Sequence, residues 1–324
     1  MKFDRILGAI SLVLTIALAP GAASAQTWPS KPIRIIVPFT PGSGTDIIAR
    51  AISDRLSANL GQPVLVENRV GAGGTIGAGV VAKSDPDGYT VLVQSSSHTV
   101  NPFTFQSLPY DTQKDFSGVT FLAVLPNVLI ISPAKGIKSV QELVAAAKAK
   151  PGTINYASAG SGSATHLNAE KFRLNAGFDG VHIPFKGSPE AVTEVMTGRV
   201  DYYFSPVVSA LPQIKEGKVL ALAVGSPTRS SILPDVPTTV EAGVPNSEYT
   251  FWVGMLVPAK TPRDVVKKLY EETQKALASP EVKERFAKLG AEAMPMTPDQ
   301  FDAYIREEMV VNEKLIKAAG IKAN

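Results

Sequence analysis

Short apolar strands alternate with amphipathic helices along most of this chain, and this alternation restricts the fold more than any other feature. Residues 33–37 (Ile-Arg-Ile-Ile-Val) have the composition of a buried strand, and apolar residues then recur at helical spacing over 47–60 until Gly61 ends the helix. Residues 64–66 and 89–93 predict two further strands. Such alternation is typical of an α/β fold with largely parallel sheets.

The length of the chain predicts two lobes, because 324 residues exceed what one core usually supports. Two apolar strands, at residues 121–131 and 219–224, bracket a self-contained α/β stretch. If both strands cross between lobes, residues 127–226 form an inserted second lobe, and the crossings act as a hinge. The first lobe then consists of residues 26–126 plus 227–324.

Helix starts can be predicted from the spacing of capping residues. Ser139, Thr261 and Thr297 each precede an acidic or amide residue by three positions, as an N-cap often does. From Thr261 onward the pattern predicts three helices in a row with no strand after them.

The N-terminus has the features of a secretory signal peptide. Lys2 and Arg5 flank the start of an apolar run over residues 6–18, which is shorter than the ~20 residues of a membrane span. Ala23-Ser24-Ala25 supplies the small residues of a cleavage site. We predict cleavage of residues 1–25, which leaves a soluble product without direct membrane insertion. In an organism with two membranes its location is the periplasm.

Composition excludes several kinds of site and partner. The chain has no cysteine, which excludes a disulfide, a thiolate metal site and a cysteine nucleophile. A net charge of +3 argues against a nucleic-acid partner bound through its phosphates. There is no G-x-S-x-G or H-E-x-x-H motif, and the glycines of residues 71–77 lack the G-x-G-x-x-G spacing of a dinucleotide site. We therefore expect no metal, no cofactor and no enzymatic activity.

Three loops join the end of a predicted strand to the start of a predicted helix, at residues 38–46, 158–163 and 184–188. Helix N-termini carry unpaired N–H groups that attract anions, and hydroxyl side chains add donors. In open α/β sheets the ligand lies beyond the carboxyl ends of the strands, where these loops fall. Lys186 is the only basic residue in the loops, which favours a carboxylate held by neutral donors. Tight turns and caps are the alternative explanation for any one loop.

Other polar and aromatic residues have simpler interpretations. His98, His166 and His182 are far apart in the sequence, with no carboxylate at ligand spacing, so capping, packing or ligand contact is expected of each. Asp46 near a helix start is interpreted as complementing the helix dipole. Trp252 is interpreted as a packing residue.

A series of motifs in fixed order runs along the chain: Trp28-Pro29-Ser30-Lys31-Pro32-Ile33, Val37-Pro38-Phe39 with Asp46, Val66-Glu67-Asn68-Arg69, Gly71-Ala72-Gly73-Gly74, Asp87-Gly88-Tyr89-Thr90, Tyr156-Ala157-Ser158 with Thr165-His166-Leu167, Pro184-Phe185-Lys186-Gly187, and Leu233-Pro234-Asp235-Val236-Pro237-Thr238 with Glu241-Ala242-Gly243. Together they resemble the Bug family, the TctC-like extracytoplasmic solute receptors of tripartite tricarboxylate transporters. The resemblance covers essentially all of the chain after the leader.

That resemblance implies a two-lobed, type II periplasmic-binding-protein fold with a hinge, which closes on a small carboxylated solute in an interlobe ligand cleft. It implies a first clamp, around one carboxylate, formed by Phe39, Thr40, Gly42, Ser43, Gly44 and Thr45. It implies a second clamp, around the other end of the solute, formed by Ser158, Ser161, Gly162, Ser163, Thr165 and His166, and joined by Lys186, Gly187 and Ser188.

Two positions depart from the family pattern. Ser43 stands where many members have one of two adjacent glycines, and it adds a hydroxyl. Ser205 stands where members that recognise amino acids often present an aspartate. The second departure favours a plain mono- or dicarboxylate over an amino acid, and Phe39 with Tyr202 and Tyr203 leaves room for an aromatic dicarboxylate.

We therefore predict a monomeric receptor that captures a small carboxylate by lobe closure and delivers it to the membrane permease subunits of a tripartite transporter. A sensory receptor that presents the same ligand to a signalling partner is one alternative. An exported hydrolase is another, with Ser163 and His166 as the candidate pair.

Overall fold

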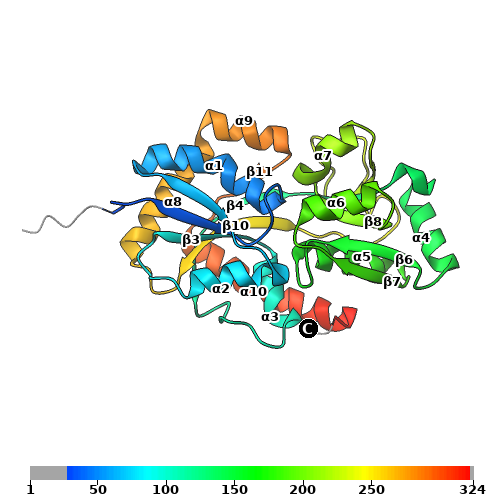
Figure 1. Cartoon of the computed structure of the whole chain (residues 1–324), viewed down its shortest axis with the longest axis horizontal. Helices are drawn as coiled ribbons and strands as arrows, with labels where there is room; N and C mark the ends of the chain where they lie inside the picture. The colour runs from blue at the N-terminus through cyan, green and yellow to red at the C-terminus, as the bar shows by residue number, and fades with distance from the viewer. Residues whose placement is uncertain (1–27, 322–324) are drawn as a thin grey trace, which may run out of the picture.

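The computed structural model describes residues 28–321, so the predicted signal peptide lies outside the described residues. The described chain forms two separate sheets, each with helices on both faces, that lie side by side (Figure 1). We call the six-stranded sheet with its helices the first lobe and the five-stranded sheet with its helices the second lobe. Between residues 28 and 321 there is no helix with the length and apolar character needed to cross a membrane.

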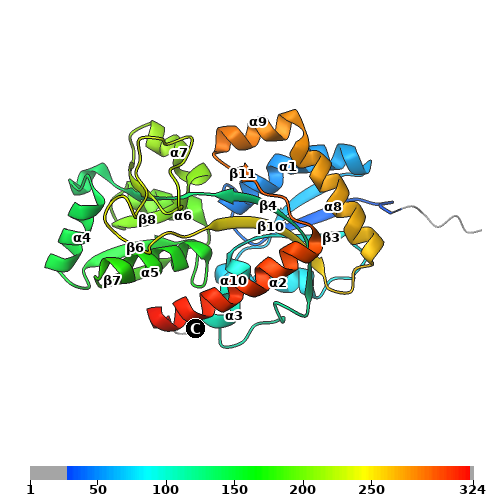
Figure 2. The same cartoon turned by 180° about the vertical axis from the view of Figure 1, so that it is seen from behind.

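The sheet of the first lobe has the strand order β11-β4-β10-β3-β1-β2. Its strands are β1 (Ile33–Val37), β2 (Val64–Asn68), β3 (Thr90–Ser95), β4 (Phe116–Leu125), β10 (Phe251–Pro258) and β11 (Glu292–Ala293). One face packs against α1 (Gly44–Leu60), α8 (Arg263–Ala278) and α9 (Pro280–Leu289). The other face packs against α2 (Thr75–Ala82), α3 (Ser97–Thr104) and α10 (Pro298–Ala319), as Figure 2 shows from behind.

The sheet of the second lobe has the order β7-β6-β8-β5-β9. Its strands are β5 (Asn127–Ile131), β6 (Ile154–Ser158), β7 (Gly180–Pro184), β8 (Tyr202–Pro206) and β9 (Leu220–Val224). Apolar side chains of α4 (Val140–Ala149) and α5 (Ala164–Ala176) cover one face. Those of α6 (Ser188–Met196) and α7 (Val207–Lys215) cover the other.

The chain crosses between the lobes twice, at neighbouring points. Only Pro126 separates β4 of the first lobe from β5 of the second. Gly225 N donates to Asn127 O (2.7 Å) and Tyr249 N donates to Gly225 O (2.6 Å), which holds the returning segment beside the outgoing one.

The segment between β9 and β10 packs on the second lobe before it returns. Thr239 N donates to Val224 O (2.9 Å), and the Gln141 amide of α4 donates to Ala242 O (2.8 Å). These contacts favour a return near Tyr249, whereas the sequence led us to place it at 226. The exact division into 127–226 and the remainder therefore stays a proposal.

Both sheets are mixed, and not largely parallel as expected. β1 pairs in parallel with β2 and β3, and β6 pairs in parallel with β7 and β8. By contrast, β4 and β10 are antiparallel. They have to be, because the chain leaves the first lobe along β4 and re-enters it along β10.

The helix starts agree with the predicted caps at two of three positions. Ser139 Oγ accepts from Glu142 N (3.1 Å), and Thr297 forms a complete capping box with Gln300. The prediction for Thr261 is wrong, because α8 begins at Arg263 and the Thr261 hydroxyl donates to Pro258 O (2.7 Å). The three C-terminal helices are present, but the two-residue strand β11 intervenes before α10 and pairs with β4.

Candidate ligand-binding site between the lobes

Four helices begin where the two lobes meet, and each follows the carboxyl end of a strand. In the first lobe, α1 follows β1 and α3 follows β3; in the second lobe, α5 follows β6 and α6 follows β7. The first N–H groups of each helix have no partner inside the helix and carry its partial positive charge. Their convergence gives the boundary between the lobes a surface suited to an anion.

A small cavity lies among these helix starts, and we call it the inner cavity. Its free volume is about 10 Å³, which is about enough for one water molecule. Among residues 28–321 no charged side chain lines it; the lining consists of Phe39, Ser43, Gly44, Thr45, Ser95, Ser97, Ala159, Ser163, Ala164, Thr165, Ser188, Pro206 and Phe251. Any ligand bound here would meet hydroxyls, backbone groups and apolar surface.

Serine hydroxyls of one lobe bond to the backbone of the other around the inner cavity. Ser43 Oγ accepts from Ser188 N at the start of α6 (3.1 Å), and Ser97 Oγ accepts from Ala164 N at the start of α5 (2.9 Å). The hydroxyl of Ser209, on α7, donates to Gly42 O (3.0 Å). Two helix N-termini are thus capped across the boundary by neutral oxygens, in the way that a carboxylate oxygen would cap them.

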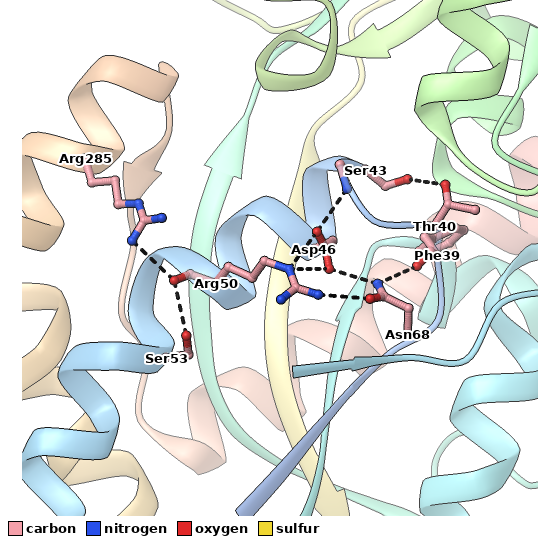
Figure 3. A network of polar contacts seen from close by, with 9 residues as sticks. Phe39, Thr40, Ser43, Asp46, Arg50, Ser53, Asn68 and Arg285 are labelled. Carbon is pink, nitrogen blue, oxygen red and sulfur yellow. Dashed lines mark hydrogen bonds and ion pairs between the residues drawn. The ribbon is translucent and has the colours of Figure 1, made fainter. Parts of the chain in front are cut away.

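The loop between β1 and α1 is fastened by a carboxylate and an amide. Asp46 accepts from Gly42 N (2.9 Å), from Arg50 Nε (3.0 Å) and from the Asn68 amide (2.8 Å). Asn68, at the end of β2, also donates to Phe39 O (2.9 Å). Figure 3 shows Asp46 between Arg50 and Asn68, on the helix that follows the loop. Beyond the helix-dipole role expected from the sequence, Asp46 therefore fixes the backbone of the first clamp.

The loop between β6 and α5 is fastened by two histidines. Ser158 Oγ lies 2.6 Å from His182 Nε2 and accepts from Gly160 N (3.1 Å). Gly162 N donates to His166 Nδ1 (3.3 Å). Burial lowers the pKa of His166 to about 4, helped by the positive charge of Arg173. Burial and the neighbouring His166 lower the pKa of His182 to about 3.

A larger hollow of about 370 Å³, which we call the mouth, shares the lining residues Phe39 and Ala159 with the inner cavity. Lys186 and the glycine-rich segment 71–74 line this mouth. Gly73 has no room for a side chain, because a Cβ there would overlap the carbonyl of Ser161 in the second lobe. The glycine-rich segment 71–74 is therefore a point of contact between the lobes.

The structure brings some of the sequence-predicted site residues to the cavities. The inner cavity is lined by Phe39, Ser43, Gly44, Thr45, Ser163, Thr165 and Ser188. The mouth is lined by Phe39, Ser161 and Lys186. His166 and Gly162 line neither; they face a third hollow together with His182 and the end of α10.

The remaining predicted residues lie behind the lining. Thr40 and Gly42 belong to the backbone of the first loop, and Gly187 packs closely on Thr40. Ser158 supports the second loop from beneath. Ser205 is fully buried, and its hydroxyl donates to Pro206 O (3.1 Å).

The sequence reasoning missed Ser95 and Ser97, which line the inner cavity, and it missed the supporting role of Asn68. Ser95-Ser96-Ser97 connects β3 to α3, and it therefore has the same strand-to-helix pattern as the three loops that were identified. The missed signal was this run of hydroxyl residues, which continues directly from a buried strand. Phe251 offered no such signal, because it comes from a strand more than two hundred residues after the first loop.

Comparison with known proteins agrees with this geometry. The family described as "Tripartite tricarboxylate transporter family receptor" matches residues 48–321. Protein BugT of Bordetella pertussis is 37% identical over 99% of both chains. The structure of Rhodopseudomonas palustris Rpa4515 with adipate is 32% identical, with a TM-score of 0.88 over 92% of this chain and 100% of that one.

A second solved structure extends the comparison. MatC from Rhodopseudomonas palustris, with bound malate, is 32% identical, with a TM-score of 0.84 over 89% of this chain and 100% of that one. The α/β fold, the arrangement of two sheets and the sequence all agree with these receptors. The chain therefore belongs to the tripartite tricarboxylate transporter receptor family, the Bug or TctC-like solute-binding receptors.

Proposed function

We propose that this protein is an exported receptor that captures a small di- or tricarboxylate between its lobes and delivers it to the permease subunits of a tripartite transporter. The observation that carries the proposal is the inner cavity, where helix N-termini from both lobes converge and the described lining is uncharged. Such a site neutralises an anion with backbone N–H groups and hydroxyls. Its relatives were solved with adipate and with malate, which are carboxylates of this kind.

The lining argues against a zwitterionic amino acid. An ammonium group needs an acceptor, and a carboxylate serves best, but no acidic side chain in the described part of the chain lines the inner cavity. Ser205 cannot replace it, because its hydroxyl is buried against Pro206. Phe39 and Phe251 both line the cavity, and two aromatic faces would suit an aromatic dicarboxylate as one member of the class.

Binding requires the lobes to separate and close. A free volume of about 10 Å³ is far below the roughly 300 Å³ of ordinary ligand pockets. The three cross-lobe serine bonds must therefore break for a ligand to enter, and its oxygens can then take their place. The adjacent crossings at Pro126 and near Tyr249 are the proposed hinge.

The test is calorimetric titration of residues 26–324 with malate, adipate, terephthalate and aspartate. We expect at least one of the first three to bind, aspartate to bind much more weakly, and the radius of gyration in solution to fall on binding. Absence of heat with all three dicarboxylates, or tight binding of aspartate alone, would contradict the proposed ligand class. Export can be checked by the mass of the secreted product, and the monomeric state by light scattering.

A further inference from the structure

Two histidines from different parts of the second lobe stack beside the loop 158–163. The ring centroids of His166 on α5 and His182 on β7 are 3.8 Å apart, and the rings are nearly parallel at 7°. Neither ring lines the inner cavity. Each instead bonds to the loop that forms the second clamp, so both can act on a ligand only through that loop.

The hydrogen bonds of this loop require His166 to be neutral, whereas a bond donated by His182 Nε2–H would survive protonation of that ring. The Ser158 hydroxyl has one proton, and Gly160 O lies 3.0 Å from its oxygen; when the proton is donated there, His182 Nε2–H is the donor to Ser158 Oγ. His166 Nδ1 accepts from Gly162 N and therefore carries no proton. Protonation of His166 would place two donors face to face at Gly162, and protonation of both rings would stack two cations.

Groups of the first lobe lie beside this histidine pair. A hollow of about 340 Å³ beside His166 and His182 is lined on the first-lobe side by Thr104 and by residues 319–321 at the end of α10. Figure 2 shows α10 extending from the first lobe towards α5. Separation of the lobes would remove these groups and admit more water to the rings, of which His166 is buried and His182 is already partly exposed.

The charged and titratable groups that face the pair belong to the second lobe. Tyr156 of β6 stacks on both rings, with centroids 6.4 Å from His166 and 5.2 Å from His182. Glu170 and Arg173 of α5 form an ion pair at 2.8 Å, and the Tyr156 hydroxyl donates to Glu170. From the first lobe, the described part of α10 contributes only uncharged residues to the same hollow.

We propose that His166 and His182 are positioning residues that hold the second clamp while both rings are neutral, and that acidification releases the loop and favours open lobes. This inference rests on the proposed function, because it assigns the loop to the ligand site. The direction follows from linkage: the closed form binds fewer protons than the open form, so closure weakens as pH falls below about 6.5. If opening fully restores the usual pKa of His166, closure is about 30-fold weaker at pH 5.

The test compares the wild type with the double variant His166→Asn, His182→Gln. The Asn oxygen can accept from Gly162 N, the Gln amide can donate to Ser158 Oγ, and neither side chain titrates. The first measurement is hydrogen–deuterium exchange at residues 160–163 without ligand, corrected for the intrinsic effect of pH. We expect protection to fall at least ten-fold between pH 7.5 and 5 in the wild type and less than two-fold in the double variant. Equal pH dependence in the two proteins would overturn the proposal.

A second measurement needs no variant. The chain has three histidines, and nuclear magnetic resonance of their rings, recorded at saturation with whichever of malate and adipate binds, should show His166 and His182 still neutral at pH 5.5. Titration of either ring near 6.5 in the ligand-bound protein would overturn the proposal. His98 provides the matched control for the exchange measurement. It is buried in the first lobe against Phe116, and His98→Gln should leave the pH dependence of exchange at residues 160–163 unchanged.

Calorimetry with malate and adipate at pH 7.5 and 5 separates this inference from the proposed function. Protonation of the ligand lowers affinity equally in the wild type and the double variant. A further loss of affinity of at least ten-fold between pH 7.5 and pH 5, seen only in the wild type, therefore supports the proposed role of His166 and His182. An equal loss in both proteins counts against it. If neither ligand binds either protein, the proposed ligand class loses support, while hydrogen exchange still decides the role of the histidines.

Discussion

The two loops that face each other across the inner cavity are held in place by different chemistry. In the first lobe, Asp46 and Asn68 fasten the loop with a carboxylate and an amide. In the second lobe, His166 and His182 fasten it with two neutral imidazoles. An amide does not titrate, whereas an imidazole changes its hydrogen-bonding role on protonation. The imidazoles of the second clamp can therefore respond to acid, whereas the amide of the first clamp keeps its hydrogen-bonding role.

The largest expected effect comes from crowding the second loop. Gly162 has φ +73°, and a Cβ there would come within 2.7 Å of Phe105 in the first lobe. We expect Gly162→Ala to weaken ligand binding about 100-fold, because the new side chain overpacks the closed form against the first lobe at a cost of about 1–3 kcal/mol. Calorimetric affinity is the measurement.

Gly152 provides the matched control for that variant. Its φ is +72°, but no atom of the described residues lies within 4 Å of the place that a Cβ would take, so Gly152→Ala adds the strain without the crowding. Affinity should be unchanged in this control. Equal losses in the two variants would mean that the contact between the second loop and the first lobe is unimportant.

The next effect comes from removing the amide of the first clamp. Asn68→Ala deletes the donor to Phe39 O and to Asp46, and we expect a loss of about 1–3 kcal/mol in the free energy of unfolding. The affinity for the ligand should fall about ten-fold relative to the wild type. This ratio of variant to wild-type affinity should be the same at pH 7.5 and at pH 5. Urea unfolding and calorimetry measure the two quantities.

Asn59→Ala is the control for Asn68, since Asn59 also donates to a backbone carbonyl of the first lobe, that of Glu272 (3.0 Å), away from the loops. It should lower stability without lowering affinity. If the loss of affinity in Asn68→Ala depended strongly on pH, the first clamp would respond to acid as the second is proposed to do, and the difference between the two clamps would be contradicted.

A third effect concerns the pH dependence of the first lobe as a whole. Burial raises the pKa of Glu308 on α10 to about 7, although Thr99 and Trp252 both donate to it (2.7 Å each). The folded form therefore binds a proton that the unfolded form has lost, and stability falls as pH rises through 7. Between pH 6 and 8 the loss should be about 1 kcal/mol. Urea unfolding of Glu308→Gln should show a smaller loss over that range; an unchanged slope would contradict this account.

The smallest effect is expected at the cross-lobe serine bonds. Ser97→Ala removes the acceptor of Ala164 N, and a neutral hydrogen bond contributes only about 0.5–1.5 kcal/mol. A ligand carboxylate can take over the same N–H, so affinity should change less than ten-fold while the unliganded protein becomes more open in solution scattering. Ser57→Ala, which removes an acceptor of Val64 N inside the first lobe, should leave the scattering unchanged. If the two variants scatter identically, the hydrogen bond between Ser97 and Ala164 does not hold the lobes together.

Much of this protein could be predicted from local pattern. Buried strands such as residues 33–37, the end of α1 at Gly61, and the caps at Ser139 and Thr297 depend on residues close in sequence, where periodicity and capping chemistry act directly. The loops at the helix starts were visible for the same reason. The direction of β10 was not, because it depends on how a distant segment returns to the first lobe.

The features of the site also fall into two kinds, those that depend on residues close in sequence and those that depend on the tertiary fold. The order of residues was enough to show that hydroxyl- and glycine-rich loops precede helices in both halves of the chain, and hence that an anion could bind at their N-termini. It took the folded chain to show that Ser97 and Phe251 join the cavity, that Ser205 is turned away, and that His166 supports the loop in place of lining the cavity. The two kinds of feature differ because a helix start is a local property, whereas a cavity and the pKa of a buried group depend on residues brought together from distant parts of the chain.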